Sequence, residues 1–184
     1  MFIQTEATPN PDVLKFIPGR PVMDTPADFP NRTAAAASPL AEALFHTPEV
    51  AGVFLGADFI AVTKSEGDWA HLKPALLTTI MEHFVSGQPM MHPDALEASD
   101  APVAEGEDAE IVAAICEILD TRVRPAVARD GGDIVFHGYH DGVVSLHMRG
   151  ACAGCPSATQ TLKHGIENLL RHYVPSVRAV HAVM

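Results

Sequence analysis

Late in the chain, a strand-like run and a helix-like run are joined by the stretch Gly150-Ala151-Cys152-Ala153-Gly154-Cys155-Pro156. Its glycines allow turn conformations that a Cβ would resist, and its proline suits the first position of a helix, where the missing N–H costs nothing. The run that follows places its apolar residues on one helical face: Leu162, Ile166, Leu169, Leu170 and Tyr173. The stretch therefore predicts a tight turn that ends at a helix N-terminus.

Cys152 and Cys155 are two of the three cysteines in the chain, and their spacing lets both sulfur atoms reach one object. The positive end of the helix dipole favours the thiolate, which is the form that binds metal. We therefore interpret the pair as half of an iron–sulfur cluster site. From the residues alone, a thiol–disulfide oxidoreductase, a zinc site and a structural role stay open as alternatives. The third cysteine, Cys116, is expected to be a small buried apolar residue.

Composition excludes several classes of protein. A net charge of −11 argues against general nucleic-acid binding, which needs a basic surface. No run of 18 or more apolar residues is present, so no membrane span is expected. Three cysteines do not form a secreted disulfide framework, and the first residues resemble neither a signal peptide nor a transit segment. We expect a bacterial cytoplasmic protein, with the mitochondrial matrix as the alternative.

The charge is unevenly spread along the chain. Residues 1–106 carry five Lys and Arg against fourteen Asp and Glu, whereas residues 107–184 carry seven against nine. The part that holds the two motif cysteines is thus the less acidic one. This distribution suits a site that must hold thiolates and an anionic cluster.

The pattern of apolar residues predicts an α+β protein with two small domains. Residues 1–86 form the first, with strands expected at 2–7, 13–17, 50–55 and 59–63, and helices at 40–45 and from residue 69 or 74 to 85. Residues 87–106 are acidic, contain proline and glycine, and lack Lys and Arg, so we expect an extended, mobile linker. The alternative is a loop packed onto one domain, with Met90, Met91 and Leu96 docked on it.

Residues 107–184 are expected to form the second domain, in the order α-β-β-α-β. A helix at 108–128 is followed by a hairpin with strands at 133–139 and 143–149, joined by Asp141-Gly142. Pro125 is expected to kink or split the last turn of that first helix. The helix at 156–173 and a strand at 177–183 complete a three-stranded mixed sheet covered by helices. The run Asp130-Gly131-Gly132-Asp133 is interpreted as a turn.

Three spaced motifs of the second domain resemble the C-terminal domain of NifU, as found in the Nfu family. They are Asp130-Gly131-Gly132-Asp133-Ile134, the stretch from Gly150 to Ser157, and Thr161-Leu162-Lys163-His164-Gly165-Ile166-Glu167. The residues from Met1 to Pro11, with Leu14-Lys15-Phe16, are similar to the N-terminal domain of mitochondrial-type and alphaproteobacterial Nfu proteins.

The resemblance implies an iron–sulfur cluster scaffold and carrier rather than an enzyme. Such a protein assembles a [4Fe–4S] cluster, with [2Fe–2S] as the alternative, receives it from a donor and delivers it to recipient apoproteins. The family's motif cysteines correspond to Cys152 and Cys155, while Ala153 stands where many relatives have serine. The alternative function, from another class, is a dithiol–disulfide oxidoreductase that uses the same C-x-x-C motif.

The number of sulfur donors predicts a homodimer in the cluster-loaded state. A [4Fe–4S] cluster normally takes four thiolate ligands, and this chain offers two at suitable spacing. Two chains related by a two-fold axis would supply all four from Cys152 and Cys155 of each copy. The acidic first domain is then free to recognise donor or recipient proteins, which is a hypothesis that rests on its charge and on the linker.

Overall fold

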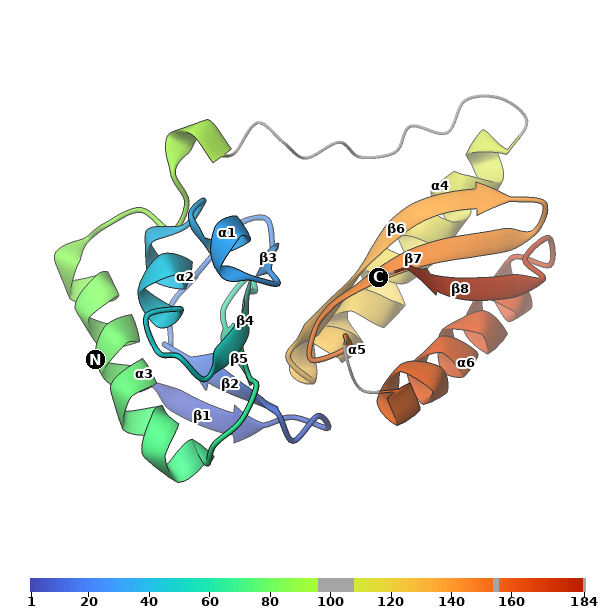
Figure 1. Cartoon of the computed structure of the whole chain (residues 1–184). Helices are drawn as coiled ribbons and strands as arrows, with labels where there is room; N and C mark the ends of the chain where they lie inside the picture. Colours follow the sequence, from blue (N-terminus) through green and yellow to red (C-terminus); the bar gives the residue numbers. More distant parts are fainter. Residues whose placement is uncertain (96–107, 154–155, 184) are drawn as a thin grey trace. The chain divides into compact units, whose positions relative to one another are not determined.

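The computed structural model describes residues 1–95, 108–153 and 156–183, and for residues 156–158 it describes the backbone only. The chain forms two compact units, Met1–Ser99 and Asp100–Met184. Each unit contains one β-sheet with helices packed on it (Figure 1). The predicted α+β class is confirmed.

The first unit is built on a five-stranded antiparallel sheet in the order β1-β2-β5-β4-β3. Its strands are β1 (Gln4–Ala7), β2 (Val13–Ile17), β3 (Ala27–Phe29), β4 (Val50–Leu55) and β5 (Ile60–Lys64). Its helices are α1 (Arg32–Ala35), α2 (Pro39–Leu44) and α3 (Trp69–Ser86), followed by the 3-10 turn η1 (Pro93–Ala95). The elements β3 and α1 were not predicted from the sequence.

The core of the first unit lies between one face of this sheet and the helices. Alternate residues of β2 and β5 point to that face, which places Leu14, Phe16 and Ile60 in one apolar cluster. The helices contribute the residues spaced three and four apart along one side, including Leu76 and Ile80 of α3. Figure 1 shows the three helices on the same side of the sheet.

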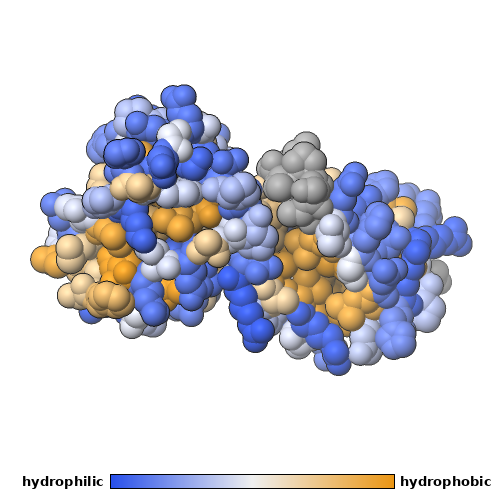
Figure 2. Space-filling model, turned by 90° about the horizontal axis from the view of Figure 1, so that it is seen from below, coloured by the Kyte–Doolittle hydropathy of each residue, from blue (hydrophilic) through white to orange (hydrophobic). Residues whose placement is uncertain are grey.

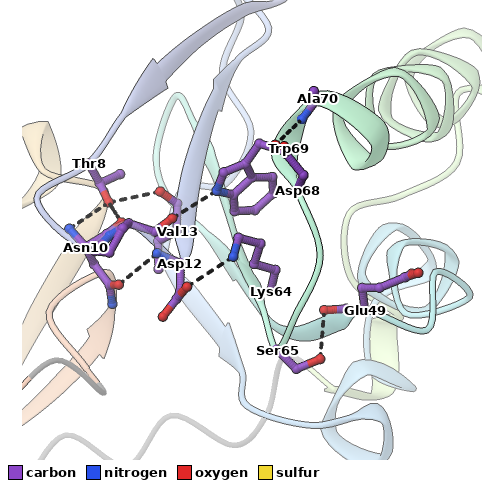
Figure 3. A network of polar contacts seen from close by, with 11 residues as sticks. Thr8, Asn10, Asp12, Val13, Glu49, Lys64, Ser65, Asp68, Trp69 and Ala70 are labelled. Atoms are coloured by element: carbon purple, nitrogen blue, oxygen red, sulfur yellow. Dashed lines mark hydrogen bonds and ion pairs between the residues drawn. The ribbon is translucent and has the colours of Figure 1, made fainter.

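A network of polar contacts fixes the loop between β1 and β2 (Figure 3). The Thr8 hydroxyl donates to the Asn10 carbonyl at 2.8 Å, and the Asn10 side-chain oxygen accepts from the Asp12 amide at 3.0 Å. The Trp69 indole N–H donates to the Pro11 carbonyl at 3.0 Å. This loop is therefore tied to the first residue of α3.

Residues 90–92 pack against the rest of the first unit, as the alternative of a docked loop predicts, so the expectation of an extended linker is wrong for this part. The hydroxyl of Ser38, the N-cap of α2, donates to the Met90 carbonyl, and the His92 amide donates to the Ala37 carbonyl at 2.9 Å. Met90 and Met91 also contact the apolar core. The remainder of the predicted linker, residues 96–106, lies outside the described residues.

The second unit has the predicted order α-β-β-α-β. Its helical first part is α4 (Ala109–Ile118), the π-helical turn η2 (Leu119–Val123) and α5 (Arg124–Arg129), and the rest is β6 (Gly132–His140), β7 (Val143–Gly150), α6 (Pro156–Tyr173) and β8 (Ala179–Val183). Strand β7 pairs antiparallel with β6 and parallel with β8, so the predicted mixed sheet is confirmed. Its apolar face, with Leu146 at the centre, meets Ile115 of α4 and Leu170 of α6.

Two backbone features of this unit follow from single residues. Asp141 and Gly142 have φ values of 48° and 82°, which is the turn predicted for the β6–β7 hairpin. Pro125 has no N–H to donate one turn back, and the helix widens just before it, where the Arg124 amide donates to the Leu119 carbonyl. The expected disturbance near Pro125 is therefore a π-helical turn.

Both units carry some apolar surface (Figure 2). In the first unit the exposed large apolar side chains include Phe2 and Val85, and in the second Tyr173 is half-exposed. Tyr173, which the helical pattern had placed on the buried face of α6, stacks instead against the Arg122 guanidinium at 4.8 Å. No helix in the described part of the chain is both long and apolar enough to span a membrane.

Candidate metal-binding turn

Cys152 lies in the turn between β7 and α6, in the position predicted from its motif. The Ala151 amide donates to the Gly131 carbonyl at 3.1 Å, and the Ala153 amide donates to the Gly150 carbonyl at 3.0 Å. The Thr159 hydroxyl of α6 donates to the Cys152 carbonyl at 3.0 Å. These bonds fix the turn to the start of β6 on one side and to α6 on the other. Cys155, the second predicted ligand, lies outside the described residues.

The Cys152 side chain is buried rather than presented to solvent. Its residue is 6% exposed and belongs to the apolar core of the second unit. The sulfur packs against Gly132, where an added Cβ would lie less than 3.0 Å from Sγ, 2.9 Å from the Cys152 amide nitrogen and 3.0 Å from the Arg149 carbonyl oxygen. A side chain at residue 132 would therefore occupy the space that the Cys152 sulfur fills, so this position requires glycine.

This environment favours the protonated thiol of Cys152. Burial, together with the smaller effect of the negative charges of Asp130 and Asp133, raises the pKa of Cys152 to about 12. The prediction that a helix dipole holds this residue as a thiolate is therefore wrong for the free protein. The cost of burying a charged sulfur outweighs the effect of a helix terminus.

An ion pair fixes the start of β6, the strand that begins at Gly132. Two guanidinium N–H groups of Arg124 donate to the two carboxylate oxygens of Asp133, at 2.9 and 3.1 Å. The Asp133 side chain is only 7% exposed, and a third N–H of Arg124 donates to Asp120 at 3.1 Å. The first residue of α5 is thus joined to the second residue of β6, which directly follows Gly132.

Only part of this site could be predicted from the sequence. The run from Asp130 to Asp133 was interpreted as a turn, and Gly131, at φ 80°, does make one. The run has a second role, because its Gly132 packs against the sulfur of Cys152. That contact joins residues twenty positions apart, so no local sequence pattern predicts it. Arg124 was not singled out at all, because an arginine near a helix end is normally solvated.

The other candidate ligands are dispersed. Within residues 1–95, 108–153 and 156–183, no three His, Cys, Asp or Glu side chains are grouped closely enough to hold a metal ion. Cys116 of α4 is half-buried rather than fully buried, and burial raises the pKa of its thiol, as does the nearby charge of Asp120. It lies apart from the turn in sequence and shows no feature of a ligand.

Comparison with known protein families matches both units. The family described as "Scaffold protein Nfu/NifU N terminal" matches residues 3–87, and the family described as "NifU-like domain" matches residues 115–181. The second match includes both cysteines of the motif.

Individual relatives extend over the whole chain. A protein of Drosophila erecta named "NFU1 iron-sulfur cluster scaffold homolog, mitochondrial" is 51% identical over 186 residues, and the human protein of the same name is 50% identical over 187. Each alignment covers 100% of this chain, which spans 65% of the fly protein and 72% of the human one. A solved NifU-like protein from Saccharomyces cerevisiae covers 50% of this chain and 86% of its own, with 23% identity and a TM-score of 0.42.

Proposed function

The chain belongs to the Nfu family of NifU-like proteins, and from this membership we propose that it is an iron–sulfur cluster scaffold and carrier. The observation that carries the proposal is the C-x-x-C motif, Cys152 and Cys155, inside the segment that matches the NifU-like domain. Relatives about 50% identical over the full length of this chain are named as scaffolds for such clusters. We assign the cluster as [4Fe–4S], shared between two chains, and its delivery to apoproteins as the function.

The chemistry of the donors fits a shared and transferable cargo. Thiolates are the usual ligands of iron–sulfur clusters, and four are needed where one chain offers two at suitable spacing. A cluster held between two chains can leave by exchange of thiolates, without the opening of a cage within one domain. Because ligation requires the thiolate, loading must remove the proton that Cys152 carries in the free protein.

The oxidoreductase alternative is less compatible with the structure. The attacking cysteine of such enzymes has a lowered pKa and is partly exposed, because the thiolate is the nucleophile. Cys152 is buried and its pKa is raised. We therefore propose a role that is not enzymatic.

For the first unit we propose recognition of donor or recipient proteins. The support is its acidity, since residues 1–99 carry twelve acidic and five basic residues. The relatives named above are mitochondrial, which agrees with the alternative location inferred from the sequence and does not support the cytoplasmic one. We therefore propose the mitochondrial matrix as the location of this protein.

Anaerobic reconstitution with iron and sulfide tests the cluster assignment. We expect about two irons and two sulfides per chain, from four of each per dimer, with the Mössbauer spectrum of a [4Fe–4S] cluster. Cys152→Ser and Cys155→Ser should lose the cluster, whereas Cys116→Ser, the matched control outside the motif, should retain it. One zinc per two chains in place of iron and sulfide would contradict the proposal.

A transfer assay tests the role of the first unit. The loaded protein should activate the apo form of a [4Fe–4S] enzyme, and deletion of residues 1–86 should slow this transfer without changing the cluster content. Equal transfer rates to every recipient tested would rule out recognition by the first unit.

A further inference from the structure

The Arg124–Asp133 ion pair stands beside the cysteine turn but contributes no ligand to it. Arg124 is the first residue of α5, and Asp133 directly follows Gly132 in β6. The pair therefore connects α5 to the residue of β6 that follows Gly132, the glycine against which the sulfur packs. A buried carboxylate held by two parallel N–H bonds has a fixed position, because both its charge and its lone pairs are satisfied there.

The start of β6 is also where the turn is attached. Gly132 is paired with Gly150 and Asp133 with Arg149, and the Ala151 amide bonds to the Gly131 carbonyl. If the first residues of β6 moved away from α5, the bond to Ala151 would break and the contact between Gly132 and the Cys152 sulfur would open. The position of the sulfur thus depends on the position of Asp133.

We propose that Arg124 is a positioning residue for Cys152, acting through Asp133 as a latch that keeps the sulfur sheltered in the core of the free protein. Given the proposed function, the sulfur has to reach a cluster shared with a second chain, whereas in this structure it packs against Gly132 in the apolar core. Cys152 must therefore leave its place against Gly132 during loading. The Arg124–Asp133 ion pair determines how often the turn opens, and therefore how readily Cys152 becomes available to bind the cluster.

The wider turn of helix just before Arg124 fits this role. The π-helical turn η2 places Arg124 at the point where the chain resumes an α-helix, and the same guanidinium holds Asp120 from that turn. The Asp120 side chain is 60% exposed, whereas that of Asp133 is 7% exposed. An exposed ion pair contributes little, so the pair with Asp133 is the one expected to hold the strand.

The test is hydrogen exchange of the full-length protein without a cluster. The reporter is the Ala151 amide, which bonds to Gly131, next to Gly132, and the amides of the central strand β7 report opening of the whole unit. In Arg124→Gln and Asp133→Asn we expect the Ala151 amide to exchange about tenfold faster or more, a factor that corresponds to about 1.4 kcal/mol in a local opening equilibrium. The β7 amides should change much less.

Two further variants separate the latch from a general effect on folding. Asp120→Asn removes the exposed partner of the same arginine and should leave Ala151 exchange as in the wild type. Arg124→Lys keeps the charge but cannot make two parallel bonds, so it should give a smaller increase than Arg124→Gln. If Arg124→Gln does not fold, the comparison of Arg124→Lys with Asp120→Asn decides the question.

A second readout follows the sulfur itself. In a Cys116→Ser, Cys155→Ser background, Cys152 is the sole cysteine, and its alkylation should speed up in Arg124→Gln but not in Asp120→Asn. The proposal is overturned if Ala151 and the β7 amides accelerate by the same factor, which is the result of a merely structural role. It is also overturned if neither Ala151 exchange nor alkylation changes. Neither measurement needs a cluster, so failure of reconstitution would remove the proposed function and leave this inference standing.

Discussion

Gly132 lies directly against the sulfur of Cys152, at a separation that leaves no room for a Cβ. This contact links the run from Asp130 to Asp133 to the cysteine motif, which lies twenty residues later. It accounts for the burial of Cys152, the residue that we propose as a cluster ligand, in the core of the second unit.

A methyl group at residue 132 should destabilise the second unit. Gly132→Ala forces the sulfur or the strand to move, and overpacking of this kind costs about 1–3 kcal/mol. Hydrogen exchange of the β7 amides measures the change in the full-length protein. The control is Gly165→Ala, at an exposed position of α6 with no atom within 4 Å of the added carbon, which should stabilise by about 0.5–1 kcal/mol. Equal effects of the two substitutions would contradict the packing described.

The Cys152 thiol of the free protein should resist ionisation. With a pKa raised to about 12, the folded state binds the proton more tightly than the unfolded state, so ionisation of this group lowers stability as pH rises above the ordinary thiol value. In the Cys116→Ser, Cys155→Ser background, thiolate absorbance in the ultraviolet should stay absent at mildly alkaline pH. The same variant in denaturant should show an ordinary thiol titration. A folded protein that ionises in the ordinary range would refute the sheltered position of the sulfur.

His83 of α3 should make the first unit less stable in acid. The residue is buried, its Nε2 has no hydrogen-bond partner among the described residues, and burial lowers the pKa of its imidazole. The unfolded state therefore binds the proton more readily, and stability falls as pH decreases through about 6.5, by at most about 1.4 kcal/mol per pH unit for one group. Trp69 is the single tryptophan and lies in the first unit, so its fluorescence reports this unfolding.

The matched variants for this prediction are His83→Phe and His71→Gln. The first removes the buried imidazole and should flatten the decrease in urea midpoint between neutral and mildly acidic pH. The second replaces an exposed histidine of the same helix and should keep the decrease. An unchanged decrease in His83→Phe would assign the acid sensitivity to another group.

Much of each fold could be predicted because its patterns are local. The alternation of Val144, Leu146 and Met148 marks one face of β7, and all three are buried. Strand β3 escaped because it has three residues, Ala27–Phe29, too few for a period of two to be visible. The order of the sheet in the first unit, with β5 between β2 and β4, is set by tertiary packing and has no local signal.

The candidate site could likewise be predicted only in part. Cys152 could be found from its motif, since two cysteines, two glycines and a proline within seven residues suit a turn before a helix. The burial of Cys152 could not be predicted, because it depends on residues 124–133. Gly132 packs against the sulfur, Arg124 and Asp133 form the ion pair, and Asp130 and Asp133 carry the nearby charges. The expected thiolate was inferred from the nearest helix end alone, and the burial of the sulfur outweighed that effect.

Ser38 should hold residues 88–92 on the first unit as well as cap α2. Its hydroxyl accepts from the Ala41 amide at 3.2 Å and donates to the Met90 carbonyl, and the residue is fully buried. Ser38→Ala should lower the free energy of unfolding by about 1–2 kcal/mol and expose residues 88–92 to proteolysis. Asn31→Ala, which removes the exposed cap of α1, should cost less and leave the protease pattern unchanged. Identical protease patterns in the two variants would show that Ser38 does not hold this segment.

The most direct test of the central claim is native mass spectrometry of the reconstituted full-length protein, performed without oxygen. The chain offers two motif cysteines, so the account predicts a species with the mass of two chains plus four irons and four sulfides, which disappears in both Cys152→Ser and Cys155→Ser. Cys116→Ser should give the same species as the wild type. A single chain that carries a complete cluster would contradict the account.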